Sequence, residues 1–279
     1  LPGLSVRTDG RPVSGFLIPD IQYSRNNGLE LSGSYYLNLA PNKDLTLSAY
    51  AFTGAPPMAS AQWRHLTSLG AYQATGYLTY SRRLDPFGGA PSGSDQLRGY
   101  IFANGRFQFD PNWSLSSSIR LASDRTFLRR YDLSRDDRLR STIDLERITD
   151  RSYLSIAGWA TQTLRLNADQ GQVPLALPAV DFRQKIGNSI LGGNLMVQAN
   201  SLALLRNDGQ DTQRAFAGAQ WDLKRLTGLG QVVTLTALVR GDVYNTNNSL
   251  ATTTASYRGT EGWTTRGIAT AAIDIEWPF

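Results

Sequence analysis

Polar and apolar residues alternate with a period of two along almost the whole chain. Segment 215–223 carries alanine, tryptophan and leucine at its odd positions and Phe216, Gly218, Gln220 and Asp222 at its even positions. Segment 233–242 repeats the pattern, with valine, leucine and alanine set against mostly polar residues. This period is that of a β-strand with two unlike faces, and no segment shows the sustained 3.6-residue stripe of a helix. The pattern predicts an all-β chain.

The alternation predicts about fourteen antiparallel strands. Most are longer than the five or six residues usual in soluble sheets, and they reach the roughly 9–11 residues that a tilted strand needs to cross a membrane. The predicted ranges are 14–24, 28–39, 43–53, 58–68, 70–82, 95–109, 112–123, 138–148, 151–165, 174–185, 189–206, 212–223, 231–244 and 266–277.

The links between these strands alternate in length. Short links cover 40–42, 68–69, 110–111, 149–150 and 187–188, and longer polar links cover 83–94, 124–137, 166–173, 207–211 and 245–265. Two links depart from this order. The link 25–27 is short where a long loop is expected, and the link 224–230 is longer than the other links at its end of the strands. Short turns at one end and long loops at the other are typical of a transmembrane β-barrel.

Alternation alone does not separate a membrane barrel from a soluble β-sandwich. In a barrel the apolar side chains face lipid and the polar ones line the lumen, whereas in a sandwich the apolar faces form the core. Strand length, loop order and aromatic residues near strand ends favour the antiparallel transmembrane β-barrel. These aromatic residues are Trp63, Tyr80, Trp113, Tyr131, Trp159, Trp221, Tyr244 and Trp277.

Composition argues against several other classes of protein. The chain has 279 residues, no cysteine and a formal net charge of +5. Without cysteine it holds no disulfide, thiolate zinc site or cysteine nucleophile. No run of about 18 apolar residues occurs, so a transmembrane helix is not expected. The basic residues are spread along the chain rather than clustered, which argues against a nucleic-acid partner.

Catalysis has little support in the sequence. The only histidine, His65, lies in an expected strand, and a lone histidine without a neighbouring nucleophile or carboxylate pattern is more often structural than catalytic. The sequence contains no nucleophile elbow, phosphate-binding loop or metal-ligand cluster. We therefore expect no enzyme activity, no catalytic residue, no metal and no cofactor.

One segment resembles a known family. Residues 14–46 read SGFLIPDIQYSRNNGLELSGSYYLNLAPNKDLT, with Arg11 shortly before them. This is similar to the first barrel strands of the LptD family, the LPS-assembly proteins of Gram-negative outer membranes, which read SGFL-x-P after an arginine and then PYYWNIAPN-x-D-x-T. The chain departs from that pattern at Ser34, where the family has proline, and at Leu37, where it has tryptophan.

The resemblance implies a larger protein than this chain. The family's barrel has about twenty-six strands and follows a periplasmic β-jellyroll. Residues 1–279 would then be a single domain fragment, the first half of that barrel, without the jellyroll and the remaining strands, and Trp277-Pro278-Phe279 would be an internal cut. The alternative is a complete fourteen-stranded porin for passive diffusion of small solutes, with Phe279 as its assembly signal.

Pro19 and Ser34 are the candidate residues of a lateral gate. Proline has no N–H to donate, so within a strand it removes one bond of the ladder. The resemblance implies that the first strand meets the last, and a weakened contact there would part sideways and release a lipid into the outer leaflet. Ser34 keeps its N–H, so any weakening at this position is smaller. An ordinary edge-strand proline is the competing interpretation.

Two further groups of residues are candidate sites. We interpret the densest match to the family as a structural signature of the periplasmic rim, formed by Tyr35, Tyr36, Asn38, Pro41, Asn42 and Asp44. Arg125, Arg129 and Arg130 are possible contacts of lipopolysaccharide phosphates. A solvated loop of internal ion pairs is the competing interpretation, because neighbouring aspartates nearly cancel the charge of these arginines.

By this resemblance the chain is expected to serve lipopolysaccharide assembly in the outer membrane of a Gram-negative cell. Lipopolysaccharide would cross the barrel lumen and leave through the lateral gate into the outer leaflet. The implied partners are lipopolysaccharide, an LptE-like lipoprotein plug, an LptA-like periplasmic bridge that acts through the missing domain, and outer-membrane lipids.

Overall fold

The computed structural model describes residues 13–85, 92–252 and 254–277 of the chain. Strands make up nearly all of its regular structure. Their bounds are β1 (Gly15–Phe16), β2 (Asp20–Ser24), β3 (Gly28–Ala40), β4 (Lys43–Phe52), β5 (Met58–Leu66), β6 (Gly70–Arg83), β7 (Ser92–Gln108), β8 (Trp113–Ala122), β9 (Arg138–Ile148), β10 (Ser152–Thr163), β11 (Leu175–Ile190), β12 (Gly193–Leu205), β13 (Asp211–Leu226), β14 (Val232–Asn247) and β15 (Gly262–Glu276). Arg11, Pro278 and Phe279 lie outside the described residues.

Helical structure in the described residues is confined to the links between strands. It consists of the single turn α1 (Phe127–Arg130) and three short 3₁₀ turns, η1 (Gln170–Gln172), η2 (Ser249–Ala251) and η3 (Ala255–Tyr257). In the described part of the chain, no helix has the length and apolar character that spanning a membrane requires.

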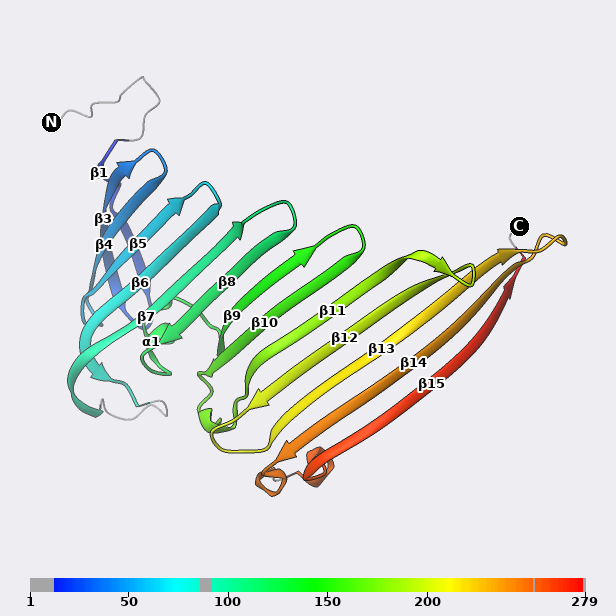
Figure 1. Ribbon diagram of the computed structural model, residues 1–279. Coiled ribbons are helices and arrows are strands. Elements are labelled where there is room, and N and C mark those ends of the chain that lie inside the picture. The colour runs from blue at the N-terminus through cyan, green and yellow to red at the C-terminus, as the bar shows by residue number, and fades with distance from the viewer. Residues whose placement is uncertain (1–12, 86–91, 253, 278–279) are drawn as a thin grey trace. The chain divides into compact units, whose positions relative to one another are not determined.

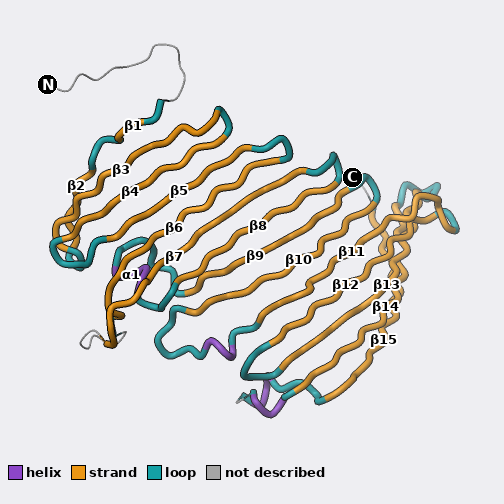
Figure 2. The backbone as a smooth tube through the Cα atoms, turned by 60° about the vertical axis from the view of Figure 1, so that its left-hand side comes forward, coloured by secondary structure: helices purple, strands orange, loops and turns teal. Residues whose placement is uncertain are grey.

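The strands form one 15-stranded sheet whose order follows the chain (Figures 1 and 2). Strands β1 and β2 both pair with β3 and form one edge, and β15 forms the other edge. The pairs from β2 to β7 and from β10 to β15 are antiparallel. The described strands are thus all-β and antiparallel, as the alternation predicted, and the sheet is consistent with part of a β-barrel.

The chain divides into two compact units, whose faces we describe separately. Unit 1 comprises residues 1–108, 116–141 and 161–168, and unit 2 comprises residues 109–115, 142–160 and 169–279. Within these ranges the strand prediction agrees closely with the structure. Three differences are the largest. The first predicted strand is divided into β1 and β2, the turn predicted at 187–188 lies at 191–192 because β11 continues to Ile190, and β15 begins at Gly262 rather than at 266.

The links keep the predicted alternation of length (Figure 1). At one end the strands are joined by the short links 41–42, 67–69, 109–112, 149–151, 191–192 and 227–231. At the other end the links include the long segments 123–137, 164–174 and 248–261. The first hairpin turn, 25–27, remains the short exception there. In outer-membrane barrels the short turns are periplasmic and the long loops extracellular.

The register of unit 1 separates a polar face from an apolar face, because residues opposite each other in antiparallel strands share a face. One row across β3 to β7 consists of Ser34, Ser48, Ser60, Tyr77 and Tyr100. A row on the other face consists of Leu37, Leu45, Trp63, Ala74 and Ala103. In a membrane barrel the second face meets lipid and the first lines the lumen.

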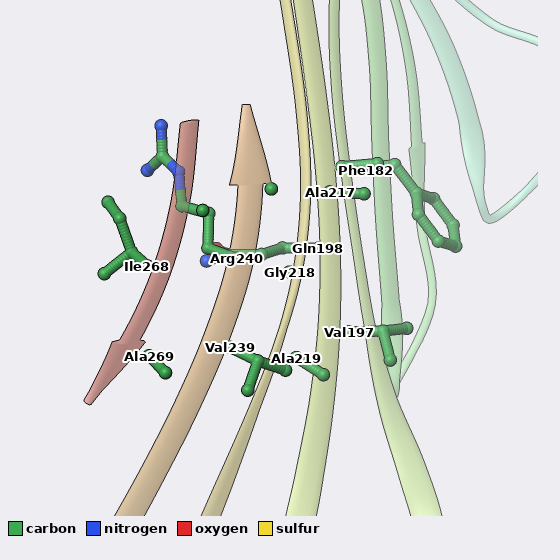
Figure 3. A pocket seen from close by; sticks show the side chains of 13 residues that line it. Phe182, Val197, Gln198, Ala217, Gly218, Ala219, Val239, Arg240, Ile268 and Ala269 are labelled. Carbon is green, nitrogen blue, oxygen red and sulfur yellow. The ribbon is translucent and has the colours of Figure 1, made fainter. Parts of the chain in front are cut away.

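Unit 2 shows the same separation. Asn200, Phe216, Asp242 and Arg266 lie opposite one another on one face, and Val197, Ala219, Val239 and Ala269 on the other. Figure 3 shows Arg240 and Ile268 pointing to one side of these strands and Phe182 and Val197 to the other.

Three charged residues on the polar face of unit 2 form ion pairs. Asp242, whose side chain is only 2% exposed, accepts hydrogen bonds from Arg240 and Arg266, at 2.9 Å and 3.2 Å from their Nε atoms. Such pairing lowers the cost of holding charged groups on a face that is partly shielded from bulk water.

We expect arginine to be rejected on the apolar face and tolerated on the polar face of β14. Val239→Arg would place a cation toward lipid, at a cost of about 2–4 kcal/mol near the bilayer midplane, whereas Leu238→Arg would place it toward the lumen. The measurement is the free energy of unfolding of the complete protein in lipid vesicles. Equal losses in the two variants would contradict the assignment of the faces.

Candidate functional site

The first strand of the sheet is interrupted at Pro19. On one side of the interruption Phe16 lies opposite Tyr35, and on the other side Asp20 lies opposite Ser32. The three residues 17–19 therefore face only two residues of β3, 33–34. The interruption is a bulge, which adds one residue to the edge strand and shifts its register against β3 by one.

The bulge follows from the chemistry of proline. Leu17 N donates to the Ser34 carbonyl at 2.9 Å, but Pro19 has no N–H with which to continue the ladder. The one-residue shift also keeps Ile21 and Tyr23 opposite Leu31 and Leu29 on the apolar face. A strand without the extra residue would turn these side chains to the polar face.

Ser34, the second gate candidate, lies at the same point of the ladder. Its carbonyl accepts the bond from Leu17, and its Oγ lies 2.8 Å from Ser48 Oγ on β4. The side chain thus holds β3 to β4, while the backbone holds the edge strand beside the interruption. Ser34 is therefore one of the two β3 residues that face the interrupted segment 17–19, which contains Pro19.

Pro19 also lines a groove on the apolar face. The groove has a volume of about 770 Å³, and its wall includes Leu31, Gly33, Ala49, Leu78 and Leu97. Small and larger apolar side chains both contribute to its wall, so a hydrocarbon chain would find apolar surface there. The interrupted edge thus opens onto the face that meets lipid.

The rim signature pairs with the first strand. Phe16 and Tyr35 form an edge-to-face ring contact with centroids 4.9 Å apart, and Asn38 N donates to Ser14 Oγ at 2.8 Å. Gly15 lies opposite Tyr36. The two parts of the family-like motif, SGFL and YYLN, are therefore neighbours across the sheet, which spacing along the sequence did not reveal.

The remaining signature residues organise the short turn between β3 and β4. Asn42 Nδ2 donates to the Leu66 carbonyl at 2.8 Å and lies 3.3 Å from His65 Nε2. Asp44 accepts two hydrogen bonds from Arg64, at 2.8 Å and 3.1 Å. These contacts tie the turn between β3 and β4 to the end of β5.

Both ring nitrogens of His65 contact neighbouring side chains of the sheet and its turn. Its Nδ1 lies 3.1 Å from Tyr72 Oη, and its Nε2 faces Asn42. Within the described ranges, no group of three His, Asp or Glu side chains is placed to hold a metal ion.

The long link 123–137, which we call the docked loop, folds back onto the polar face of unit 1. Its first residues are held by an ion pair between Arg98 on β7 and Asp124, with side chains 2% and 8% exposed. Arg98 donates to both Asp124 oxygens at 2.8 Å and 3.0 Å, to Thr126 Oγ1, to Ser81 Oγ and to the Arg82 carbonyl. All five guanidinium N–H donors are thereby used.

The Asp124 carboxylate remains charged at pH values well below those at which an ordinary aspartate becomes protonated. Burial alone would raise its pKa, but hydrogen bonds from Arg98, Thr126 and Ser123, together with the charge of Arg98, outweigh burial and lower the pKa to about 2. The anchor of the docked loop is therefore an ionic one at all pH values above about 4.

Apolar side chains of the docked loop pack on an aromatic part of the polar face. Phe127 and Leu128 are fully buried and Tyr131 is 4% exposed. Phe127 and Tyr131 pack together with Met58 against partly buried residues of the sheet, among them Tyr50, Phe52, Tyr77 and Tyr100. Tyr131 Oη also donates to Thr79 Oγ1 at 3.1 Å. Helix α1 accordingly lies against β7 (Figure 2).

Arg130 connects the docked loop to the first hairpin. Its Nη1 donates to the Asn26 carbonyl at 2.6 Å and to Asn27 Oδ1 at 3.1 Å, and its Nη2 donates to the Gly54 carbonyl. Asn27 is fully buried at the turn between β2 and β3. One guanidinium thus joins α1 to the outer end of the interrupted edge strand.

The three arginines that we considered as phosphate contacts have different surroundings. Arg125 donates to the carbonyls of Leu166 and Ala168, at 3.2 Å and 2.8 Å, and Arg130 is engaged as described. Arg129 is exposed, and its side chain has no polar partner among the described residues. The pairing of Arg98 with Asp124, which anchors the loop, has no signal in the sequence, because the two residues are 26 positions apart and no local pattern links them.

Comparisons with known proteins agree with this architecture. The profile of the family described as LPS transport system D, LptD, matches residues 96–279. The chain belongs to the LptD family. The matched region begins beyond the SGFL and YYLN segments that carry the resemblance seen in the sequence, so the two observations rest on different residues.

Curated LptD-family relatives support the assignment at modest identity. An LPS-assembly protein LptD from Actinobacillus pleuropneumoniae serotype 5b is 27% identical over 77% of this chain and 28% of its own length. Those from Xanthomonas oryzae pv. oryzae and Psychrobacter cryohalolentis are 30% and 48% identical, over 52% and 24% of this chain and 17% and 7% of their own lengths. The chain thus spans less than a third of the length of each of these LptD proteins.

We expect the docking of the loop to weaken in acid. The pKa of Asp124 is about 2 in the folded protein and 3.8 ordinarily. The charged Asp124 therefore stabilises the docked loop fully above pH 4, and this stabilisation is lost as the pH falls toward 2. The loss is about 2 kcal/mol. The mobility of a spin label at position 129, followed from pH 5 to pH 2, measures it. In Asp124→Asn the label should be mobile throughout, and a wild-type label that stays immobile at pH 2 would contradict the prediction.

We expect Arg130→Ala to release the first hairpin turn. Three hydrogen bonds are lost and the buried Asn27 Oδ1 is left without its donor, which costs about 1–3 kcal/mol. Hydrogen exchange at residues 24–29 of the complete protein should accelerate at least several-fold. Arg129→Ala is the matched control, since Arg129 is exposed on the same turn of helix. Similar exchange in both variants would show that Arg130 does not hold the hairpin.

Proposed function

We propose that the chain forms part of a barrel that assembles lipopolysaccharide into the outer leaflet of the Gram-negative outer membrane. Its membership of the LptD family supports this function. The single observation that carries the proposal is the interruption at Pro19, which weakens the edge strand where the apolar groove begins. A lipid that leaves the lumen sideways needs such a weak place.

The two faces suit an amphiphile. The polar face, with its serine, tyrosine and paired ionic residues, is compatible with a sugar head, and the apolar groove beside Pro19 is compatible with acyl chains. We propose that the head passes along the lumen while the acyl chains move on the lipid side. Pro19 and Ser34 then form one side of the lateral gate.

In our proposal, the chain forms only part of the complete barrel. The edges β1–β2 and β15 have no further partner strand among the described residues, and exposed edges are aggregation-prone in isolation. We propose that additional strands complete the barrel and that a periplasmic jellyroll precedes it. An LptE-like lipoprotein within the barrel and an LptA-like bridge on the jellyroll would be its partners.

The passive porin is the weaker candidate. Membership of a transport family that assembles LPS does not favour it, and the docked loop places apolar side chains on the lumen face.

A photo-crosslinking residue at Asp20 of the complete protein in cells separates the two functions. The assembly function predicts a lipopolysaccharide adduct that disappears when upstream lipid transport is depleted. Absence of adducts at every barrel position would support the porin.

We expect Pro19→Ala to slow lipid delivery. Alanine restores an N–H to the edge strand, and one added ladder bond of about 1 kcal/mol corresponds to roughly fivefold slower parting of the strands. The measurement is the rate at which newly made lipopolysaccharide reaches the cell surface in cells that carry the complete variant protein. Ile18→Ala is the control, because it changes a neighbouring exposed side chain without adding an N–H. An unchanged rate in Pro19→Ala would remove the gate role from Pro19.

A further inference from the structure

A polar pocket lies at the short-turn end of unit 1, apart from the groove at Pro19. Its volume is about 360 Å³, within the range of small-molecule sites. Five consecutive strands contribute one residue each to a single cross-strand row, and all five line the pocket. They are Asn38, Asp44, Arg64, Gln73 and Asn104.

The charged members of this row neutralise each other. Arg64 donates to both oxygens of Asp44, whose side chain is 18% exposed. The pair is held in a fixed, planar arrangement and leaves little net charge for attracting a phosphate. Lys43 at the turn is the one lining cation that has no ion pair within the described residues.

The side-chain amides of Gln73 and Asn104 have unused hydrogen-bonding capacity. The two residues lie opposite each other and are partly buried, and their side chains make no hydrogen bond with any described residue. Each amide offers two N–H donors and a carbonyl acceptor. The aromatic ring of Tyr36, two residues before Asn38 on the same face, also lines the pocket.

We infer that this pocket binds the hydroxyl groups of a sugar, as an entry site for the oligosaccharide head of the lipid. Sugar hydroxyls donate and accept, which matches amides beside a neutral carboxylate–guanidinium pair, and a sugar ring packs well on an aromatic face. The short-turn end is the periplasmic end of such barrels, where an arriving head would first meet the wall. The inference rests on the proposed function and names the chemistry of one of its binding sites.

Photo-crosslinking in the complete protein within its native membrane complex tests the inference. The reactive residue is placed at Gln73, at Ala74 as the matched control on the opposite face, and at Asp20 as the reporter of the proposed function. We expect lipopolysaccharide adducts at 73 but not at 74. In isolated complexes, an excess of lipid-free core oligosaccharide should lower the adduct at 73 at least threefold, and inorganic phosphate should not.

The outcomes separate the two proposals. Adducts at Asp20 without adducts at Gln73 would overturn the sugar site and leave lipid assembly intact, whereas absence of adducts at both positions would count against lipid assembly itself. Competition by phosphate instead of oligosaccharide would make this an anion site centred on Lys43 and overturn the inference. A second variant, Gln73→Leu with Asn104→Leu, should weaken oligosaccharide competition for a crosslinker at Thr75 threefold to tenfold, and unchanged competition would also overturn it.

Discussion

The membrane requires every backbone polar group of a spanning strand to find a partner within the protein, and the rest of this structure depends on how that demand is met. Long strands in chain order satisfy it along most of the sheet, and the edge strand fails to do so at Pro19. There a residue that cannot donate interrupts the edge strand, and the bulge that results preserves the orientation of Ile21 and Tyr23 toward lipid. The weakness is thus confined to hydrogen bonding and does not disturb the two faces.

The same hairpin is held firmly at its outer end. Arg130 binds the turn between β2 and β3, and the docked loop that carries Arg130 is fixed by the buried pair of Arg98 and Asp124. Truncating either partner of a buried ion pair leaves the other charge uncompensated, which costs several kcal/mol. A weak ladder at Pro19 therefore lies between a well-paired rim at Asn38 and a fixed turn at Asn27. Parting of the strands would begin in the middle of the edge rather than by fraying from an end.

Much of this fold could be predicted from the sequence, because each strand carries its own evidence in the alternation of its residues. The alternation of loop lengths could likewise be predicted, because each turn is formed by residues that are close together in the sequence. The one-residue register shift at the bulge could not be predicted. Pro19 indicates that the hydrogen-bond ladder is interrupted, but the sequence does not show how many residues of β3 lie opposite the interruption. The pairing of Arg98 with Asp124 and the path of the docked loop depend on tertiary contacts between distant segments. Arg125 and Arg130 appeared free for phosphates in sequence but bind backbone carbonyls, which only folding could reveal.

The positions of the polar and apolar features define an order of contacts for an amphiphile. The row from Asn38 to Asn104 lies on the lumen face near the short turns, whereas the groove at Pro19 lies on the lipid face farther along the same strands. A head held by neutral hydrogen bonds is released more readily than one held by unpaired charges, because each bond to water replaces one to the protein at little net cost. In the proposed function, the neutral pair of Asp44 and Arg64 therefore suits a wall along which a sugar head would move. A strongly cationic row would retain a phosphorylated head and oppose its passage to the proposed gate.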